Sequence, residues 1–318
     1  MPLPRTALGT SDLSVFPLNL GGNVFGWTAD RQASFDILDA FTAGGGNFVD
    51  TADGYSAWVP GNTGGESERL IGEWHQLSGN RDELVIATKV SEHPDFKGLS
   101  ASNIAAAADA SLQRLRTDHI DLYYAHFDDT SVPLEETVTA LSALVDAGKV
   151  RYIGISNYSA ARVAEWFRIV EAKGLHRPVA LQPHYNLVER GYESELRSIA
   201  EQEQLAVLPY YSLASGFLTG KYRGGSSIDS PRADGARAYL EKHEALLPVL
   251  DEVAASHGVS MAAVSLAWLR SQPTIVAPIA SARSVEQLPD LLISATLELS
   301  AEEITAVSDA SLAATTMV

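Results

Sequence analysis

The chain alternates short apolar runs with amphipathic stretches from Leu18 onward, and this alternation restricts the folds that it can adopt. A short apolar run bounded by turn residues is typical of a buried parallel strand, and an amphipathic stretch after it is typical of a covering helix. Repeated strand–helix units indicate βαβ connections around a parallel sheet. The pattern predicts eight strands, at residues 18–20, 47–50, 84–88, 120–125, 152–155, 179–182, 206–208 and 275–277.

The predicted helices have recognisable ends. Asp30 is a suitable N-cap for a helix over residues 32–43, and the glycines that begin at Gly44 can end it. Ser159 can cap a helix over residues 160–172 in the same way. Further helices are predicted over residues 133–147, 241–256, 260–271, 285–292 and 301–310.

Eight strand–helix units without a composition break or a linker favour a closed (β/α)8 barrel over a doubly wound sheet. The length of 318 residues fits one such barrel, so a single barrel domain over residues 1–318 is expected. An N-terminal hairpin before the first strand and extra C-terminal helices after the last complete the predicted fold. The longest irregular region covers residues 212–238, and loops of this length in a compact domain are usually functional or disordered.

Composition excludes several classes of function. The net charge of −17 disfavours nucleic acid and anionic membrane as partners, because both would be repelled. The chain has no cysteine for a disulfide or a thiolate metal site, and its histidines lack metal-ligand spacing, so no metal is expected. No apolar run approaches the roughly 18 to 20 residues of a membrane span, and the first residues lack a signal-peptide core. A cytoplasmic protein is therefore expected.

Polar side chains stand where the second, third and fourth predicted strands end. Asp50 and Tyr55 follow the second strand, Lys89 the third and His126 the fourth. Because the active site of a barrel is built at the C-terminal ends of its strands, these side chains are expected to meet. Each alone has a structural reading, as a turn acid, a rim tyrosine, a lysine extended towards solvent and a core histidine. Their convergence at one barrel mouth favours a functional site.

The chemistry that such a group supports is proton delivery by Tyr55. A phenol has a pKa of about 10, and a neighbouring ammonium such as that of Lys89 is expected to lower this pKa. Asp50 can pair with Lys89 and position it, and His126 can orient a carbonyl oxygen beside the Tyr55 hydroxyl. The four residues therefore predict a general-acid site that requires a hydride donor.

Several motifs together make the chain resemble the aldo-keto reductase superfamily over nearly its whole length. They are NFVDTADGY at residues 47–55, ATK at 87–89, DLYYAH at 121–126, GISNY at 154–158, LQPHYNL at 181–187 and GFLTGK at 216–221. The resemblance implies a (β/α)8 barrel, a nicotinamide cofactor and a catalytic tetrad with Tyr55 as the proton donor. The tetrad consists of Asp50, Tyr55, Lys89 and His126.

The same resemblance implies how the nicotinamide half of the cofactor would be held. Ser156, Asn157 and Gln182 would contact the carboxamide, and Tyr210 would stack beneath the ring. The loop after Tyr210 would lie along the pyrophosphate, where glycines permit close approach of the backbone and a lysine adds positive charge. The loop residues expected to bind the cofactor are Leu213, Gly216, Leu218, Gly220 and Lys221. The alternative is that this loop is a flexible surface segment.

Arg283 and Gln287 fall where similar proteins grip the adenosine 2′-phosphate, and a guanidinium suits that group. NADP(H) is therefore expected in preference to NAD(H), although a surface arginine at a helix start is the alternative. The chain departs from the family pattern nearby, with Ala280 and Ser281 in place of proline and glycine and Leu291 in place of an asparagine.

The expected function is an NADPH-dependent aldo-keto reductase that acts on an aldehyde, a ketone or a keto-sugar. Trp27, Trp58 and Phe127 follow strand ends and can line an aromatic substrate pocket. One alternative is an NADP(H)-sensing regulatory barrel subunit with little turnover. Another is a barrel hydrolase, which needs two facing carboxylates at the mouth, for which only Asp128 and Asp129 are available beside the tetrad acid.

Overall fold

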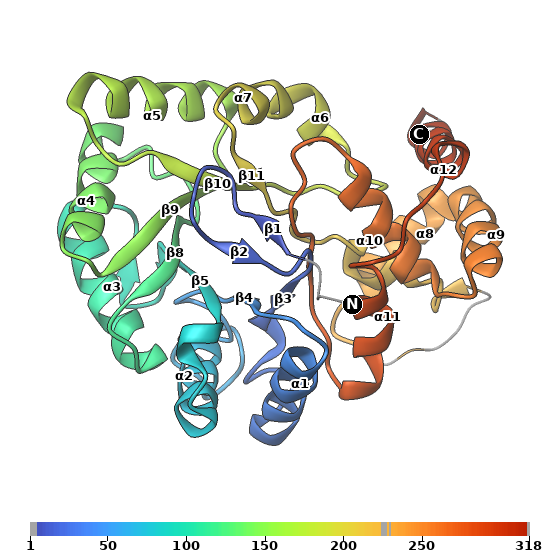
Figure 1. Cartoon of the computed structure of the whole chain (residues 1–318), viewed down its shortest axis with the longest axis horizontal. Helices are drawn as coiled ribbons and strands as arrows, with labels where there is room; N and C mark the ends of the chain where they lie inside the picture. The colour runs from blue at the N-terminus through green and yellow to red at the C-terminus, as the bar shows by residue number, and fades with distance from the viewer. Residues whose placement is uncertain (1–4, 224–227, 229, 317–318) are drawn as a thin grey trace.

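The computed structural model describes residues 5–223, 228 and 230–316, and eight parallel strands form its curved central sheet (Figure 1). The strand order is β11–β10–β9–β8–β5–β4–β3–β12, and every neighbouring pair is parallel. Helices surround the sheet, so the predicted (β/α)8 barrel is confirmed. The strands are β3 (Asn19–Gly21), β4 (Phe48–Asp50), β5 (Val85–Val90), β8 (Ile120–Ala125), β9 (Val150–Ser156), β10 (Pro178–Gln182), β11 (Ala206–Val207) and β12 (Ile279–Ala280).

The barrel closes through the segment that leads into β12. Val207 of β11 bridges to Ile275, and the Val276 N–H donates a 3.0 Å hydrogen bond to the Val207 carbonyl oxygen. Ile279 and Ala280 then pair with β3. The segment therefore hydrogen-bonds first to the seventh strand of the barrel and then to the first, which joins the two edges of the sheet.

The predicted position of the eighth strand, residues 275–277, is wrong. The strand begins at Ile279, a few residues later in the sequence. The strand lies at Ile279–Ala280, because only there does the backbone pair in register with β3. Pro278 separates the two stretches, and its missing N–H interrupts the ladder. The most apolar run in this region therefore precedes the strand instead of forming it.

The helices follow the predicted pattern closely where their caps were recognised. Asp30 and Ser159 each accept a hydrogen bond from a backbone N–H in the first turn of the helix that follows. Ser260, which was not predicted as a cap, does the same for the helix after it. The helices around the sheet are α1 (Arg31–Ala43), α2 (Glu66–Ser78), α3 (Ala101–Leu115), α4 (Leu134–Asp146), α5 (Ala160–Lys173), α6 (Gly191–Glu195), α7 (Arg197–Gln202) and α10 (Met261–Ser271). No helix within the described ranges has the length and apolar character needed to cross a lipid bilayer.

Additional helices lie beside the barrel near the C-terminus (Figure 1). They are α8 (Ala233–His243), α9 (Leu247–His257), α11 (Leu288–Ile293) and α12 (Ala301–Thr316). The single helix predicted over residues 241–256 is wrong, because a 3-10 turn at Glu244–Leu246 separates α8 from α9. Pro248 stands in the first turn of α9, where it cannot donate a helical hydrogen bond to the preceding turn.

The region predicted to be irregular, residues 212–238, is partly helical. A 3-10 segment covers Ala214–Thr219, and α8 already begins at Ala233. The glycine- and serine-rich residues 224–227 and 229 within this region lie outside the described residues. The start of α8 shows only a weak helical repeat of apolar residues. Its alanines, which favour a helix, and its tertiary contacts are enough to form one there.

An N-terminal hairpin, β1 (Thr6–Ala7) and β2 (Ser14–Val15), lies across one opening of the barrel (Figure 1). Its residues Leu8, Leu13 and Val15 are buried in one cluster with inward side chains of the barrel strands. The predicted hairpin is therefore present, and it closes the N-terminal end of the barrel. The opposite end, where the strands finish, stays available for a site.

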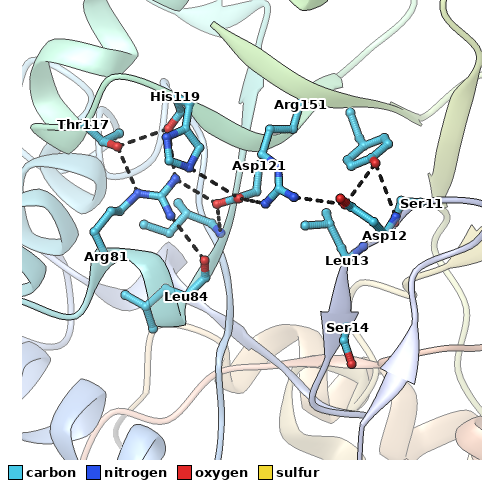
Figure 2. A network of polar contacts seen from close by, with 12 residues as sticks. Ser11, Asp12, Leu13, Ser14, Arg81, Leu84, Thr117, His119, Asp121 and Arg151 are labelled. Atoms are coloured by element: carbon cyan, nitrogen blue, oxygen red, sulfur yellow. Dashed lines mark hydrogen bonds and ion pairs between the residues drawn. The ribbon is translucent and has the colours of Figure 1, made fainter. Parts of the chain in front are cut away.

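An ion cluster around the buried Asp121 connects this hairpin to the N-terminal end of the barrel (Figure 2). Asp121 of β8 accepts hydrogen bonds from Arg81 at 2.8 Å, from Arg151 at 2.9 Å and from the Ile86 N–H at 3.0 Å. Arg151 reaches in the other direction to Asp12 of the hairpin at 2.9 Å. One buried carboxylate therefore connects three parts of the chain at the end of the barrel opposite the predicted site.

Candidate functional site

The predicted catalytic residues meet because a strand has a period of two. Phe48, Val85 and Leu122 point into the barrel, so residues two or four positions later in each strand point the same way. The side chains that this period brings to the C-terminal end of the barrel belong to Asp50, Lys89 and His126. Asp50, Tyr55 and His126 line a cavity of about 650 Å³ there, and Lys89 lies directly behind its wall.

Lys89 links the acid and the tyrosine. Its Nζ donates to Asp50 Oδ1 at 2.5 Å, to the Thr51 carbonyl oxygen at 2.8 Å and to the Tyr55 hydroxyl at 3.0 Å. An ammonium has three N–H donors, and these contacts use all of them. The Tyr55 oxygen therefore accepts from Lys89, which leaves the hydroxyl proton of Tyr55 free to be donated into the cavity.

The electrostatics of this group differ in one respect from the sequence prediction. Burial raises the pKa of Tyr55 above its usual value, and the Lys89 ammonium offsets only part of that effect. The prediction that Lys89 lowers the pKa of Tyr55 overall is therefore wrong, although the direction of the contribution from Lys89 is right. Burial by itself lowers the pKa of Lys89, but Asp50, Tyr55 and their hydrogen bonds raise it by more, which keeps the ammonium charged.

His126 stands beside Tyr55 with its ring centroid 6.1 Å from the tyrosine ring. Burial and the nearby charge of Lys89 lower the pKa of His126 well below its usual value. Its Nδ1 is buried and has no hydrogen-bond partner among the residues that the structure describes. A neutral imidazole at the cavity wall can hydrogen-bond a ligand oxygen placed next to the Tyr55 hydroxyl.

The residues expected to hold a carboxamide form one hydrogen-bonded chain beside this group. Gln182 Nε2 donates to Asp50 Oδ2 at 2.9 Å, and Ser156 Oγ donates to the Gln182 carbonyl oxygen at 2.9 Å. Asn157 Nδ2 donates to Ser156 Oγ, and the Tyr210 hydroxyl donates to Asn157 Oδ1. Asn157, Gln182 and Tyr210 line the cavity, whereas Ser156 is fully buried behind it.

The loop after Tyr210 has an unusual backbone. Tyr211, Ala214 and Ser215 have φ values of 53°, 47° and 57°, in the left-handed region that residues other than glycine seldom adopt. Such strain clusters at ligand sites, where the surrounding structure fixes it. Gly216, with φ of 94°, leaves the cavity wall without a side chain, so a ligand can approach the backbone closely.

The structure divides the predicted loop residues into two groups. Leu213, Gly216 and Lys221 line the cavity. Leu218 is fully buried in the core, and Gly220 packs against Met261 so closely that an added Cβ would overlap it. Leu218 and Gly220 therefore support the loop from behind and do not line the cavity.

Three basic side chains line the cavity. They are Lys221, Arg232 and Arg283, and none of them has a carboxylate partner within the described part of the chain. The Arg232 guanidinium lies over the Trp27 ring, 5.7 Å from its centroid. Gln287 also lines the cavity and accepts a 2.9 Å hydrogen bond from the Arg283 N–H through Oε1. Sequence reasoning missed Arg232, because it stands in the irregular region and belongs to no recognisable motif.

Aromatic side chains line the cavity around Tyr55. Trp27 and Trp58 make an edge-on contact at 5.5 Å, and Phe127 lies 4.8 Å from the His126 ring. All three line the cavity, together with Tyr211, which the sequence did not single out. Trp58, Phe127 and Tyr211 are 52%, 43% and 50% exposed, so large apolar surface is available to a ligand at the mouth.

The hydrolase alternative depends on Asp128 or Asp129 as a second carboxylate, and both have other partners. Asp128 accepts two hydrogen bonds of 2.7 Å from Arg162, and Asp129 accepts from the Leu99 N–H and from Ser131. Neither acid lines the cavity, so neither can face Asp50 across a substrate.

Comparison with known proteins gives consistent matches across the chain. The model of the Aldo/keto reductase family matches residues 17–311. Norsolorinic acid reductase stcV from Emericella nidulans is 35% identical over 97% of this chain and 83% of its own length. The uncharacterized oxidoreductase YrpG from Bacillus subtilis is 35% identical over 96% of this chain and 94% of its own. The aryl-alcohol dehydrogenase GME11368 from Pestalotiopsis microspora is 32% identical over 95% of this chain and 82% of its own.

The relatives are similar to this chain along almost all of the barrel, including the strands whose ends form the cavity. Several of them are named as reductases or oxidoreductases, which agrees with a carbonyl-directed oxidoreductase. Because the family model matches nearly the whole chain and the relatives are similar over nearly all of it, the chain belongs to the aldo/keto reductase family.

Proposed function

We propose that the protein is an NADP(H)-dependent reductase that interconverts carbonyl compounds and alcohols, with Tyr55 as the proton donor. The observation that carries the proposal is the commitment of all three Lys89 N–H groups to Asp50, Thr51 and Tyr55. This arrangement directs the remaining Tyr55 proton into a cavity whose other wall is a neutral histidine. Such a pair can protonate and orient one oxygen atom.

The charge state of the group suits reduction. Because the pKa of Tyr55 is raised, the hydroxyl keeps its proton at neutral pH and is ready to act as an acid. When the proton leaves, the negative charge forms next to the Lys89 ammonium, which Asp50 holds in place. The ammonium therefore stabilises the phenolate that is formed in the reaction more than the phenol that precedes it.

His126 would fix the substrate relative to Tyr55. A neutral imidazole donates a single hydrogen bond without adding a charge that would compete with the Lys89 ammonium. The Asn157 side chain donates to the His126 carbonyl oxygen at 2.9 Å, which fastens the end of β8 to the segment after β9. The histidine is therefore held at the cavity by its backbone as well as by its neighbours.

The cavity fits a nicotinamide dinucleotide, the type of cofactor that this family generally uses. When bound, a reduced nicotinamide would supply the hydride for the carbonyl carbon, and an oxidised one would accept it from the alcohol carbon. Asn157 and Gln182 would hold its carboxamide, and Tyr210 would pack against its ring. The strained loop around Gly216 and the unpaired cations would hold the phosphates, and Arg283 would favour NADP(H) over NAD(H).

The mouth of the cavity favours apolar carbonyl compounds with an aromatic ring. Trp27, Trp58, Phe127 and Tyr211 offer ring faces and edges around the Tyr55 hydroxyl. Two similar proteins are named for norsolorinic acid reduction and for aryl-alcohol dehydrogenation, which supports the same choice. Among aldehydes, ketones and keto-sugars, aryl aldehydes and aryl ketones are therefore the proposed substrates.

The experiment is a panel of aryl aldehydes, aryl ketones and keto-sugars, assayed with NADPH and with NADH by the change in cofactor absorbance. The variant Tyr55→Phe should bind NADPH normally and lose about 100-fold or more of turnover, the usual contribution of a general acid. Tyr152→Phe, at the opposite end of the barrel, is the matched control and should keep its activity. Normal turnover in Tyr55→Phe would exclude the assigned role. Tight NADPH binding without turnover on any carbonyl would favour a regulatory subunit instead.

A further inference from the structure

Asp53 is a fully buried acid that the reaction does not use. It lies between the end of β4 and Tyr55, in the segment that carries the proton donor. The Asp53 N–H donates a 3.1 Å hydrogen bond to the Lys89 carbonyl oxygen, and the Tyr55 N–H donates to the Ala52 carbonyl oxygen at 3.2 Å. A displacement of Asp53 therefore moves the backbone of both Tyr55 and Lys89.

The charges around Asp53 come from several elements. Glu68 of α2 is fully buried, and its Oε2 accepts a 2.6 Å hydrogen bond from Nε of Arg114 in α3. Its Oε1 accepts another 2.6 Å bond from the Thr88 hydroxyl. The Tyr123 ring of β8 is also buried there, and the charges of Asp53 and Glu68 act on its hydroxyl.

His93, in the short strand β6 (Glu92–His93), faces the same ion pair. Burial lowers the pKa of His93, and the charge of Arg114 lowers it further, so the imidazole adds no positive charge near neutral pH. Arg114 is thus the cation that acts on Asp53, and its Nε is already bonded to Glu68.

Two buried acids consequently share one cation. Neither carboxyl oxygen of Asp53 has a hydrogen-bond partner among the described residues, whereas both oxygens of Glu68 are bonded. An ionised carboxylate without a partner is costly to bury, so the group keeps its proton. Burial and then the charge of Glu68 raise the pKa of Asp53, and Arg114 with the nearby Gly54 and Ser91 amides offsets part of this, so that the resulting pKa is about 8.

We propose that Asp53 is a neutral carboxylic acid in the working enzyme and a positioning residue for Tyr55, so that its ionisation sets an alkaline limit to carbonyl reduction. A negative charge at Asp53 would be repelled by Glu68 and would draw water towards the segment. The distance of 3.0 Å between Lys89 Nζ and the Tyr55 hydroxyl depends on that segment. The link to turnover rests on the proposed function of Tyr55, but the protonation of Asp53 does not.

Activity gives the first test. The variant Asp53→Asn resembles the neutral acid in shape and cannot ionise. It should keep turnover within about threefold of wild type near neutral pH, and it should keep that turnover above about pH 8, where wild type declines. Tyr55 itself cannot account for the decline, because its pKa is raised above the usual value of about 10. The same decline in both proteins would overturn the positioning role.

Stability gives a second test that needs no substrate. An unfolded aspartate ionises near pH 4, so between about pH 4 and pH 8 only the folded wild type holds this proton. The stability of wild type then falls with rising pH relative to Asp53→Asn, and the difference levels off above about pH 8. The melting temperature of Asp53→Asn minus that of wild type should therefore increase across this window. A difference that does not change with pH would mean a merely structural side chain and would overturn the proposal.

Two controls isolate the electrostatic cause. Asp95→Asn changes an exposed acid of the neighbouring loop and should leave both pH profiles unchanged. In a Glu68→Gln background, the charge that repels an ionised Asp53 is lost and Arg114 has Asp53 as its remaining acid, so the pH dependence of the Asp53→Asn step should become smaller. An unchanged pH dependence in that background would overturn the two-acid explanation. If Asp53→Asn does not fold, a neutral isostere is not tolerated, which also contradicts a neutral Asp53.

Discussion

The Tyr210 hydroxyl donates a 2.8 Å hydrogen bond to Oδ1 of Asn157, and this bond joins the segments that follow β11 and β9 beside the cavity. Asn157 has a φ of 57°, a left-handed conformation that asparagine tolerates better than most residues. One face of the Tyr210 ring stacks on the His184 ring, with ring centroids 5.2 Å apart and an angle of 15° between the ring planes. The ring proposed to support the nicotinamide is thus fixed at its edge and on one face.

This arrangement predicts graded effects at Tyr210. Tyr210→Phe keeps the ring and loses one hydrogen bond, which contributes about 0.5–1.5 kcal/mol, so NADPH should bind about threefold to tenfold more weakly. Tyr210→Ala also loses the ring and should bind NADPH more weakly still. Both effects can be measured by fluorescence titration, with Tyr152→Phe as the control. Wild-type affinity in Tyr210→Phe would show that the bond to Asn157 does not orient the ring.

Arg283 is predicted to discriminate between the two cofactors. A hydrogen bond to a charged group contributes about 1.5–3 kcal/mol, so Arg283→Ala should raise the KM for NADPH about tenfold or more. The KM for NADH, which lacks the 2′-phosphate, should change little. Arg237→Ala is a matched control, because Arg237 lies on α8 and pairs only with the exposed Asp234 among the described residues. Equal effects on both cofactors would place Arg283 away from the 2′-phosphate.

Asp121 is predicted to control stability without affecting the site. Its carboxylate is 1% exposed and pairs with Arg81 and Arg151. Asp121→Asn therefore removes the carboxylate that pairs with Arg81 and leaves Arg151 with Asp12 alone. Breaking a buried ion pair in this way costs about 3–5 kcal/mol, which should lower the melting temperature by several degrees. Turnover at low temperature should persist, because Asp121 stands at the start of β8 and His126 follows its other end.

The control for this prediction is Asp109→Asn. Asp109 and Lys149 form a pair with 51% and 37% of their side chains exposed, and such surface pairs contribute about 0–1 kcal/mol. Its melting temperature should stay close to that of wild type. If the two variants melt alike, the cluster around Asp121 does not hold the hairpin to the barrel.

Much of the fold could be predicted because each strand and helix carries its own signal. The apolar runs predict the strands, and caps such as Asp30 and Ser159 mark helix starts through local hydrogen bonds. The errors arose where no local signal exists. The last strand depends on which backbone groups face β3 after Pro278, and the break before α9 depends on Pro248 at a point of continuous helical propensity.

The candidate site divides in the same way. Residues two positions apart in a strand share a face, so the convergence of Asp50, Lys89 and His126 follows from the strand assignments. Arg232 and Tyr211 were missed because they come from a loop whose path has no periodic signal. Their place at the cavity depends on packing between distant parts of the chain.

The sequence by itself determined the barrel and the convergence of Asp50, Lys89 and His126 at its C-terminal mouth, because these follow from short-range periodicity. Only the tertiary structure decided the protonation states of the acidic groups at or near that mouth. The pKa of Tyr55 is raised instead of lowered, and the pKa of Asp53 is raised to about 8, through burial and through charges from distant elements. A pKa reports the whole environment of a group, and that environment exists only after the chain has folded.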